Sequence, residues 1–361
     1  MAAGRGTSAA VAPEAQVSER QTRHEDIVHD FLGDPPDIEP GNIFPIEWRE
    51  ETTALTDIYE KSKRDVWNPS HLPWANLDPG EWSEEERLAI MYWFGVLANF
   101  DASGPAVFAK AMVRSYELHE EDPIRRCLFS IVRDEQNHEE TCGRMIQRVW
   151  PGGPLQFQPR TELERLAQRN LKWLYYNGAR YWNGYSQALY RYPLAILFSS
   201  FLMGEVASST LFHHMYRHSQ HPVFQQAFLN IGKDEARHQA ICMRMLEKHF
   251  ATLGPDDRRL VTRQLRAGFV FLSMILYEPP DQFWIIPPDF ADVHRRLESI
   301  ARGAGLGVAT LDQKAANWQQ AMLRMKAIVE KHGIAFPAMP EVGITGEEVT
   351  DFTEADLIPV F

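Results

Sequence analysis

A short pattern of acids and histidines occurs twice in the chain. The first copy reads DEQNHEETCGRMIQ and contains Glu135 and His138, and the second reads DEARHQAICMRMLE and contains Glu235 and His238. Each copy is a Glu-x-x-His, and residues three apart lie on one face of a helix. Each copy can therefore direct a carboxylate and an imidazole at the same point. Two such helices that face each other predict a site for two metal ions.

Both glutamates of these pairs stand on apolar helix faces. On a helical wheel, Leu128 and Ile131 lie close to Glu135, and Phe228 and Ile231 lie close to the second glutamate. An ionised carboxylate that is buried alone costs far more free energy than a domain can tolerate, so it needs a proton, an ion pair or a metal. The arginines available for ion pairs project away from these faces in their own helices; they are Arg144, Arg237 and Arg244. The metal is therefore the favoured explanation, and a buried ion pair is the alternative.

Two further apolar stretches each contain a single acid. Asp101 is the only carboxylate in residues 87–116, and Glu205 is the only one in residues 185–218. If the helices are antiparallel, a turn near residue 220 brings Glu205 level with the second pair, and a turn near residue 121 brings Asp101 to within about one helical turn of the first. The predicted metal ligands are Asp101, Glu135, His138, Glu205, Glu235 and His238.

The proportions of this ligand set indicate which metals would bind. Four carboxylates and two neutral imidazoles balance the charge of two divalent cations. One nitrogen per metal in an oxygen-rich site favours iron or manganese over zinc. We therefore predict two iron ions (Fe2+/Fe3+), with manganese as the alternative at one or both sites.

The residues around the ligands suggest supporting roles. Metal-bound histidines usually donate their other N–H to a carboxylate. Asp134 and Asp234 precede the ligand glutamates, and we expect a crossed pairing in which Asp234 contacts His138 and Asp134 contacts His238; ordinary surface acids are the alternative. The expected substrate-pocket residues follow Glu205 and are Ser208, Ser209 and Phe212.

Other groups near these helices have more ordinary expected roles. Gly104 and Pro105 predict a distorted turn close to Asp101, which either opens room for oxygen or substrate or relieves packing. His213 and His214 are expected to be structural or surface residues. The aromatic residues of 173–185 are expected to pack a helix onto the bundle rather than to line a pocket.

Composition and charge narrow the class of protein. The 361 residues carry 49 acids and 37 bases, a net charge of −12, which disfavours nucleic acid and anionic membranes as partners. The three cysteines cannot form a dense disulfide framework and favour a reducing compartment, so we expect a cytoplasmic protein. The N-terminus lacks the apolar core of a signal peptide, and residues 192–212 fit a buried helix better than a membrane span.

The pattern along the chain predicts an all-α fold, a ferritin-like four-helix bundle with an N-terminal arm and additional C-terminal helices. Residues 1–25 are expected to be disordered, 26–332 to form a single helical domain with the metal-binding bundle at about 82–250, and 333–361 to form a tail. The arm would be anchored by Trp48, Trp67 and Trp74. Predicted helices cover about 53–64, 82–119 with a break at Gly104, 123–150, 161–183, a fourth to about 218 with a kink near Pro193, 222–250, 255–277, 289–303 and 308–332.

Over about residues 80–250, the order acid, Glu-x-x-His, Glu, Glu-x-x-His resembles the ferritin-like diiron oxygenase/oxidase superfamily. That group includes ribonucleotide reductase small subunits, acyl-carrier-protein desaturases, multicomponent monooxygenases and the p-aminobenzoate N-oxygenase type. Two positions depart from its members. Cys142 stands where the reductase subunits carry a radical tyrosine, and Ile231 stands where the N-oxygenase type carries an extra histidine ligand.

The resemblance implies a non-haem dinuclear-iron oxidoreductase, an O2-dependent oxygenase or oxidase that hydroxylates, N-oxygenates or desaturates a small organic substrate. Glu135 and Glu235 would bridge or chelate the metals, and Asp101 and Glu205 would be terminal or shifting ligands. An electron donor (a ferredoxin or a flavin reductase) and a homodimer are implied as well. Two alternatives stay open: a radical-generating or metal-oxidising subunit that serves a protein partner, and a non-catalytic helical module.

Overall fold

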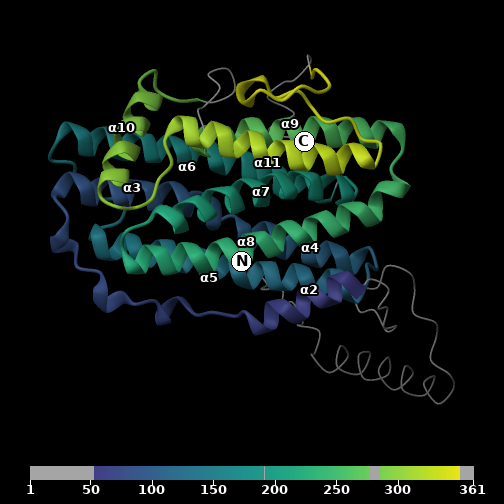
Figure 1. The fold of residues 1–361 in the computed structure, drawn as a ribbon, viewed down its shortest axis with the longest axis horizontal. Coiled ribbons are helices and arrows are strands. Elements are labelled where there is room, and N and C mark those ends of the chain that lie inside the picture. The colour runs from purple at the N-terminus through teal and green to yellow at the C-terminus, as the bar shows by residue number, and fades with distance from the viewer. Residues whose placement is uncertain (1–52, 191, 277–284, 350–361) are drawn as a thin grey trace, which may run out of the picture. The chain divides into compact units, whose positions relative to one another are not determined.

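The computed structural model describes residues 53–190, 192–276 and 285–349, which belong to one compact unit, Phe44–Phe361 (Figure 1). The described residues are mostly α-helical. Two isolated β-bridges, Pro337–Glu347 and Met339–Ile344, close a short loop near the C-terminal end of the described chain. The prediction of an all-α fold is therefore confirmed.

Two antiparallel layers form the bundle. In one layer α5 (Asp122–Val149) packs against α3 (Glu84–Asp101) and α4 (Gly104–Glu117), and in the other α7 (Leu194–His218) packs along α8 (Pro222–His249). The layers meet where α5 contacts α8, the two helices that carry the Glu-x-x-His pairs (Figure 1). The repeated pattern therefore lies on neighbouring helices.

Local sequence signals explain where the first bundle helices begin and end. Ser83 caps α3, and its side chain and that of Glu86 form the predicted capping box. The chain leaves the helix after Asp101 and re-enters one at Gly104, where Pro105 occupies an early position that needs no backbone N–H. The predicted break near Asp101 is therefore a real junction between two helices.

The connection before α7 differs from the prediction. α6 (Glu162–Ala188) continues five residues beyond the predicted end at 183, and α7 begins after Pro193, which is its N-cap residue. Pro193 therefore separates two helices and does not kink one. The physical reason is that proline fits the start of a helix, whereas inside a helix it removes a hydrogen bond and clashes with the preceding turn.

The remaining helices surround the bundle. α2 (Thr53–Arg64) covers α5 and α8, and α9 (Pro255–Leu276) and α11 (Leu311–Lys331) contact α7, while α10 (Phe290–Gly303) packs on α3 and α6. Of the predicted arm anchors, Trp67 and Trp74 pack against the core, whereas Trp48 lies outside the described residues, as does the segment 1–25.

Aromatic side chains fill much of the bundle interior. Trp93, Phe94, Phe198, Phe224 and Phe228 are fully buried, and the rings of Phe94 and Phe228 stack with centroids 5.9 Å apart. Burial of one such side chain stabilises the fold by roughly 1.5–3 kcal/mol. Throughout the described part of the chain, no helix is long and apolar enough to cross a membrane.

Candidate metal centre

The six predicted ligands come together inside the bundle as two groups. One group is Asp101, Glu135 and His138, and the other is Glu135, Glu205, Glu235 and His238. Within each group the candidate ligand atoms lie within 4.8 Å of one another, and all of these residues are buried. Glu135 belongs to both groups, so its carboxylate is placed to bridge two ions.

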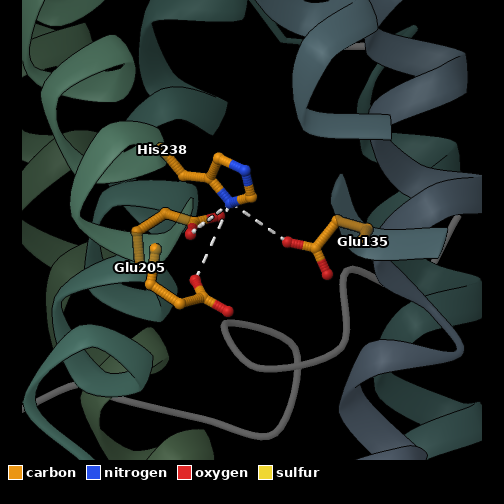
Figure 2. Close-up of side chains that lie close together, drawn as sticks. Glu135, Glu205 and His238 are labelled. Carbon is orange, nitrogen blue, oxygen red and sulfur yellow. Dashed lines mark ion pairs between the residues drawn. The ribbon is translucent and has the colours of Figure 1, made fainter. Parts of the chain in front are cut away.

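Both histidines turn the Nδ1 atom of the ring towards carboxylates. His238 Nδ1 lies 3.3 Å from Glu135 Oε1 and 3.3 Å from Glu205 Oε2 (Figure 2). His138 Nδ1 lies 3.4 Å from Glu235 Oε1. Among the described residues, neither Nδ1 atom has a hydrogen-bond partner, although both are buried. Because a buried polar atom without a partner costs free energy, these two nitrogens fit a site that a metal ion fills.

The other ring nitrogen of each histidine faces an aspartate from the opposite helix. His138 Nε2 lies 3.2 Å from Asp234 Oδ2, and His238 Nε2 lies 3.4 Å from Asp134 Oδ2. This is the crossed arrangement expected from the sequence. Such a contact fixes the orientation of the ring and leaves the opposite nitrogen free for a metal. That the two aspartates contribute to metal retention is still a prediction.

A buried arginine forms hydrogen bonds with both aspartates. Arg237 donates to Asp134 Oδ2 at 2.9 Å and to Asp234 Oδ1 at 2.5 Å. Arg133 also pairs with Asp134, at 2.8 Å, and the indole N–H of Trp67 donates to Asp234 Oδ2 at 2.6 Å. Arg237 therefore neutralises the aspartates behind the histidines and not the glutamates that face them.

The alternative of a buried arginine–glutamate pair finds no support in these contacts. Arg144 pairs with Glu140, and Arg244 pairs with Glu247, both towards the surface. The charge that balances the clustered carboxylates must therefore come from the imidazoles, from protons or from metal ions.

The pKa values of the clustered groups show that their buried carboxylates are stabilised by positive charge. Burial, reinforced by the carboxylate of Glu235, raises the pKa of Glu205 well above its usual range. Burial also raises the pKa of Asp101 to about 7, against the opposing effect of His138. Burial disfavours the charged form of His238, but Glu205 and Asp134 outweigh it and raise the pKa of that imidazole. Burial therefore favours protonated forms of Asp101 and Glu205, and a divalent cation would displace those protons on binding.

Two contacts near Asp101 shape the first group. The thiol of Cys142 donates to Asp101 Oδ2 at 3.1 Å. The Glu135 carboxylate lies directly against Gly104, so closely that a Cβ atom at this position would overlap it. The helix junction at Gly104 therefore serves to admit the shared carboxylate. The space beside Gly104 is taken by this carboxylate, so room for oxygen or substrate at the predicted turn stays a prediction.

A small cavity of about 50 Å³ adjoins the second group. Its walls come from α4, α6 and α7 and are mainly apolar; they are Gly104, Val107, Phe108, Tyr181, Trp182, Ser200, Phe201, Gly204 and Glu205. The α7 residues that line the cavity are Glu205 and residues that precede it in the sequence. The expected pocket residues Ser208, Ser209 and Phe212 are not among these walls. Ser209 lines a different hollow, and Phe212 is buried against Phe228.

Several residues of the site could not be identified from local sequence. Trp67 is distant in sequence from Asp234, and Tyr181 and Trp182 were expected only to pack α6 onto the bundle. One signal was available for Arg237, which stands three positions after Asp234 and so shares its helix face. The sequence showed Gly104 only as a glycine before a proline and gave no sign that the Glu135 carboxylate lies against it.

Comparisons with known proteins agree with this architecture. No protein-family model matches the chain, and no curated protein sequence matches it. Among solved structures it is similar to an R2-like ligand-binding oxidase with an aerobically reconstituted Mn/Fe cofactor, at 16% identity and a TM-score of 0.51, over 81% of this chain and 98% of that one. A point mutant of that oxidase matches at 17% identity, with a TM-score of 0.52 and the same coverage.

At this level of identity the likeness establishes the fold. The chain has the helical-bundle architecture of these oxidases, and the prediction of a ferritin-like bundle is confirmed. The match extends over nearly the whole of the oxidase chain, so it includes the helices around the bundle as well as the bundle itself.

Proposed function

We propose that this protein is a non-haem dinuclear-metal oxidoreductase that activates O2, with iron as the metal and manganese as the alternative at one or both positions. The observation that carries the proposal is the pair of ligand groups that share Glu135, each with a buried imidazole nitrogen that faces carboxylates. The Mn/Fe cofactor of the similar oxidase supports the same choice of metals.

Each ligand would have a distinct place. Asp101 and His138 would hold one metal, and Glu205 and His238 the other. Glu135 would bridge the two, and Glu235 lies within 3.4 Å and 3.8 Å of the two imidazole nitrogens, placed to contact both metals. When bound, the metals would supply the electrons that reduce O2. The donor set of carboxylates with one imidazole for each metal suits iron and manganese.

The protein around the metals would control what reaches them. A cavity of about 50 Å³ has room for O2 but is far smaller than the hundreds of Å³ of a typical ligand pocket. A substrate would therefore be small or would enter after the walls of α4, α6 and α7 move apart. Because these walls are aliphatic and aromatic, they favour an apolar part of the substrate. We therefore propose oxidation at a C–H group, by hydroxylation or desaturation, ahead of N-oxygenation.

Repeated turnover with O2 would require a supply of electrons. We propose a ferredoxin or a flavin reductase as the donor, and a homodimer as the assembled form, both on the superfamily resemblance. The three cysteines are free and buried, which supports a reducing location such as the cytoplasm.

Metal content measured by mass spectrometry, on protein purified with iron supplementation, tests the central proposal. We expect about two metal ions per chain in the wild type and loss of both in Glu135→Ala/Glu235→Ala. The matched control is Glu140→Ala/Glu247→Ala, which removes two acids from the same helices at positions that pair with surface arginines. The control should keep its metals, and the ferrous wild type should consume O2. A folded wild-type protein that binds no iron or manganese would refute the proposal.

A further inference from the structure

A second hollow, of about 680 Å³, lies outside the metal centre and is lined by residues of α7, α8 and α11. We call it the α7–α11 groove. Its size falls within the range of small-molecule binding sites in proteins. Its lining residues are Val206, Ser209, Thr210, His213, His214, Arg217, His218, Gln239, Asn317, Gln320, Ala321 and Arg324.

The charge of this groove is opposite to that of the whole protein. The lining includes two arginines and three histidines and no acid, although the chain has a net charge of −12. Arg217 extends from α7 and Arg324 from α11, so the two guanidinium groups come from different helices. Among the described residues, neither arginine forms an ion pair. Both guanidinium groups are exposed and are therefore accessible to an anion.

The pKa values of two histidines in the groove are lowered by their surroundings. The rings of His214 and His218 lie with centroids 4.3 Å apart. Burial, together with the neighbouring His218 and Arg302, lowers the pKa of His214 to about 4. Burial and the nearby Arg217 lower the pKa of His213 as well. These two histidines are therefore neutral, and the positive charge of the groove comes from Arg217 and Arg324, which would attract an anion.

Neutral polar groups complete the lining. The side-chain amides of Gln239, Asn317 and Gln320 provide N–H donors, and they come from α8 and α11. The dipole of α7 explains why basic residues gather at its C-terminal end, but it does not account for Arg324 and the amides of α11. Three helices therefore present cationic and neutral donors to one hollow.

We propose that the α7–α11 groove binds a small anionic molecule that carries phosphate or carboxylate groups. Planar guanidinium groups bind both kinds of anion through paired, charge-assisted hydrogen bonds. A metal ion is a poorer fit, because in the described part of the chain the histidines of the groove do not belong to any group of three or more potential metal ligands. The concave shape and the volume favour a small molecule over a flat protein surface.

The groove and the candidate metal centre are neighbours, but no predicted metal-ligand residue lines the groove. Val206 and Gln239 line the groove and directly follow Glu205 and His238 along α7 and α8. Binding of an anion here is therefore independent of the proposed function, and either idea can fail without the other.

Isothermal titration calorimetry on the full-length protein, without added metal because pyrophosphate and citrate chelate iron and manganese, tests the proposal. Pyrophosphate and citrate are the probes for the two anion chemistries, used at one fixed ionic strength because salt screens such interactions. In Arg217→Gln/Arg324→Gln we expect at least about tenfold weaker binding, since two charge-assisted hydrogen-bond donors are lost. Both arginines are exposed, so the variant should fold, and circular dichroism checks that it does.

The matched control is Arg165→Gln/Arg259→Gln, which removes two exposed arginines from α6 and α9, far along the chain from the groove. This control should bind the better probe as tightly as the wild type. Equal weakening in both variants would reduce the effect to overall charge and overturn the proposal, and so would failure of both probes to bind at millimolar concentration. Binding of an acidic ferredoxin, but of neither probe, that is lost only in the groove variant would replace the small-molecule site with a protein-docking surface.

Discussion

At the scale of single residues, the candidate metal centre depends on positions that lack a side chain as well as on the ligand residues. Glu135 can enter both ligand groups because Gly104 has no side chain where the carboxylate lies. Gly204, which also lines the cavity, has open space within 4 Å of the position that a Cβ atom would occupy. The two glycines therefore face the same region but have opposite tolerance for an added methyl group.

Substitution of the two glycines should separate these roles. Gly104→Ala should displace Glu135 and weaken metal affinity by about 10–100-fold, the cost seen when supporting residues of metal sites are changed. Gly204→Ala should keep both metals and stabilise α7 by up to about 1 kcal/mol, because alanine is the better helix former. Metal titration and urea unfolding measure the two effects. Equal metal loss in both variants would contradict the role given to Gly104.

The aspartates behind the histidines lead to a second prediction at this scale. Asp234→Asn removes the charged acceptor of His138, so we expect about 10–100-fold weaker retention of the metal nearest that histidine. Resistance to a chelator, followed by metal analysis, measures it. Asp65→Asn is the control, because Asp65 is more exposed and approaches Arg237 only at 3.9 Å. Identical chelator resistance in the two variants would show that Asp234 has no supporting role.

At the scale of elements, a buried polar cluster holds α10 and α11 to the bundle. Tyr92 on α3 lies 2.9 Å from His294 Nδ1, and His294 Nε2 lies 3.1 Å from Glu298 on α10. Lys314 on α11 forms an ion pair with the same carboxylate, and only 3% of the lysine surface is exposed. Three helices thus meet at Glu298.

Breaking this ion pair from one side should be costly. Lys314→Met leaves Glu298 buried without its cation, so we expect a loss of about 3–5 kcal/mol in the free energy of unfolding. Lys314→Met/Glu298→Leu removes both charges and should recover much of the loss. Urea denaturation compares the three proteins. A single variant as stable as the wild type would mean that the pair does not hold the helices together.

The same carboxylate makes the stability of this contact depend on pH. Burial opposes ionisation of Glu298, but His294 and Lys314 outweigh it and lower its pKa from 4.5 to about 2. The unfolded chain therefore takes up this proton first as the pH falls. The stabilisation, about 3 kcal/mol as an order of magnitude, is complete above pH 4.5 and is lost between pH 4.5 and 2. The difference in stability between wild type and Glu298→Gln should shrink over that range, and a constant difference would refute this assignment.

At the scale of the whole molecule, the metal ions would join helices from both layers of the bundle. A ligand that binds only the folded state stabilises it by about 4 kcal/mol at a thousand times its Kd. Addition of Fe2+ under anaerobic conditions should therefore raise the melting temperature of the wild type. Glu135→Ala/Glu235→Ala, which lacks the shared ligands, should show no rise. A rise of equal size in both proteins would place the stabilising metal elsewhere.

Much of the helical bundle could be predicted from the sequence, because apolar and acidic residues recur at helical spacing. The helix bounds of α2, α5 and α8 follow from capping residues, prolines and apolar stripes, and the two Glu-x-x-His pairs fall on neighbouring helices as expected. The lone acids Asp101 and Glu205 were identified because a carboxylate on an apolar stripe needs an explanation.

Other features depend on tertiary contacts that periodicity does not encode. The hydrogen bond from Trp67 to Asp234 spans 167 positions of the chain. The cavity walls depend on which side of α7 its neighbours leave open, so the residues that line it differ from the residues expected after Glu205. The connection at Pro193 required a choice between a kink and a break, and both are compatible with a proline in an apolar segment.

The crossed pairing of histidines and aspartates gives the centre an approximate twofold symmetry, which the contacts of Arg237, Arg133 and Trp67 break. Asn137 occupies, in the first copy of the motif, the place that Arg237 occupies in the second. The single Arg237 contacts both aspartates, but Asp134 also pairs with Arg133, so its charge is the more fully neutralised. His238 consequently faces the weaker acceptor. Two metal ions held by this duplicated pattern would thus have unequal surroundings, and under limiting supply we expect the position at His138 to fill first.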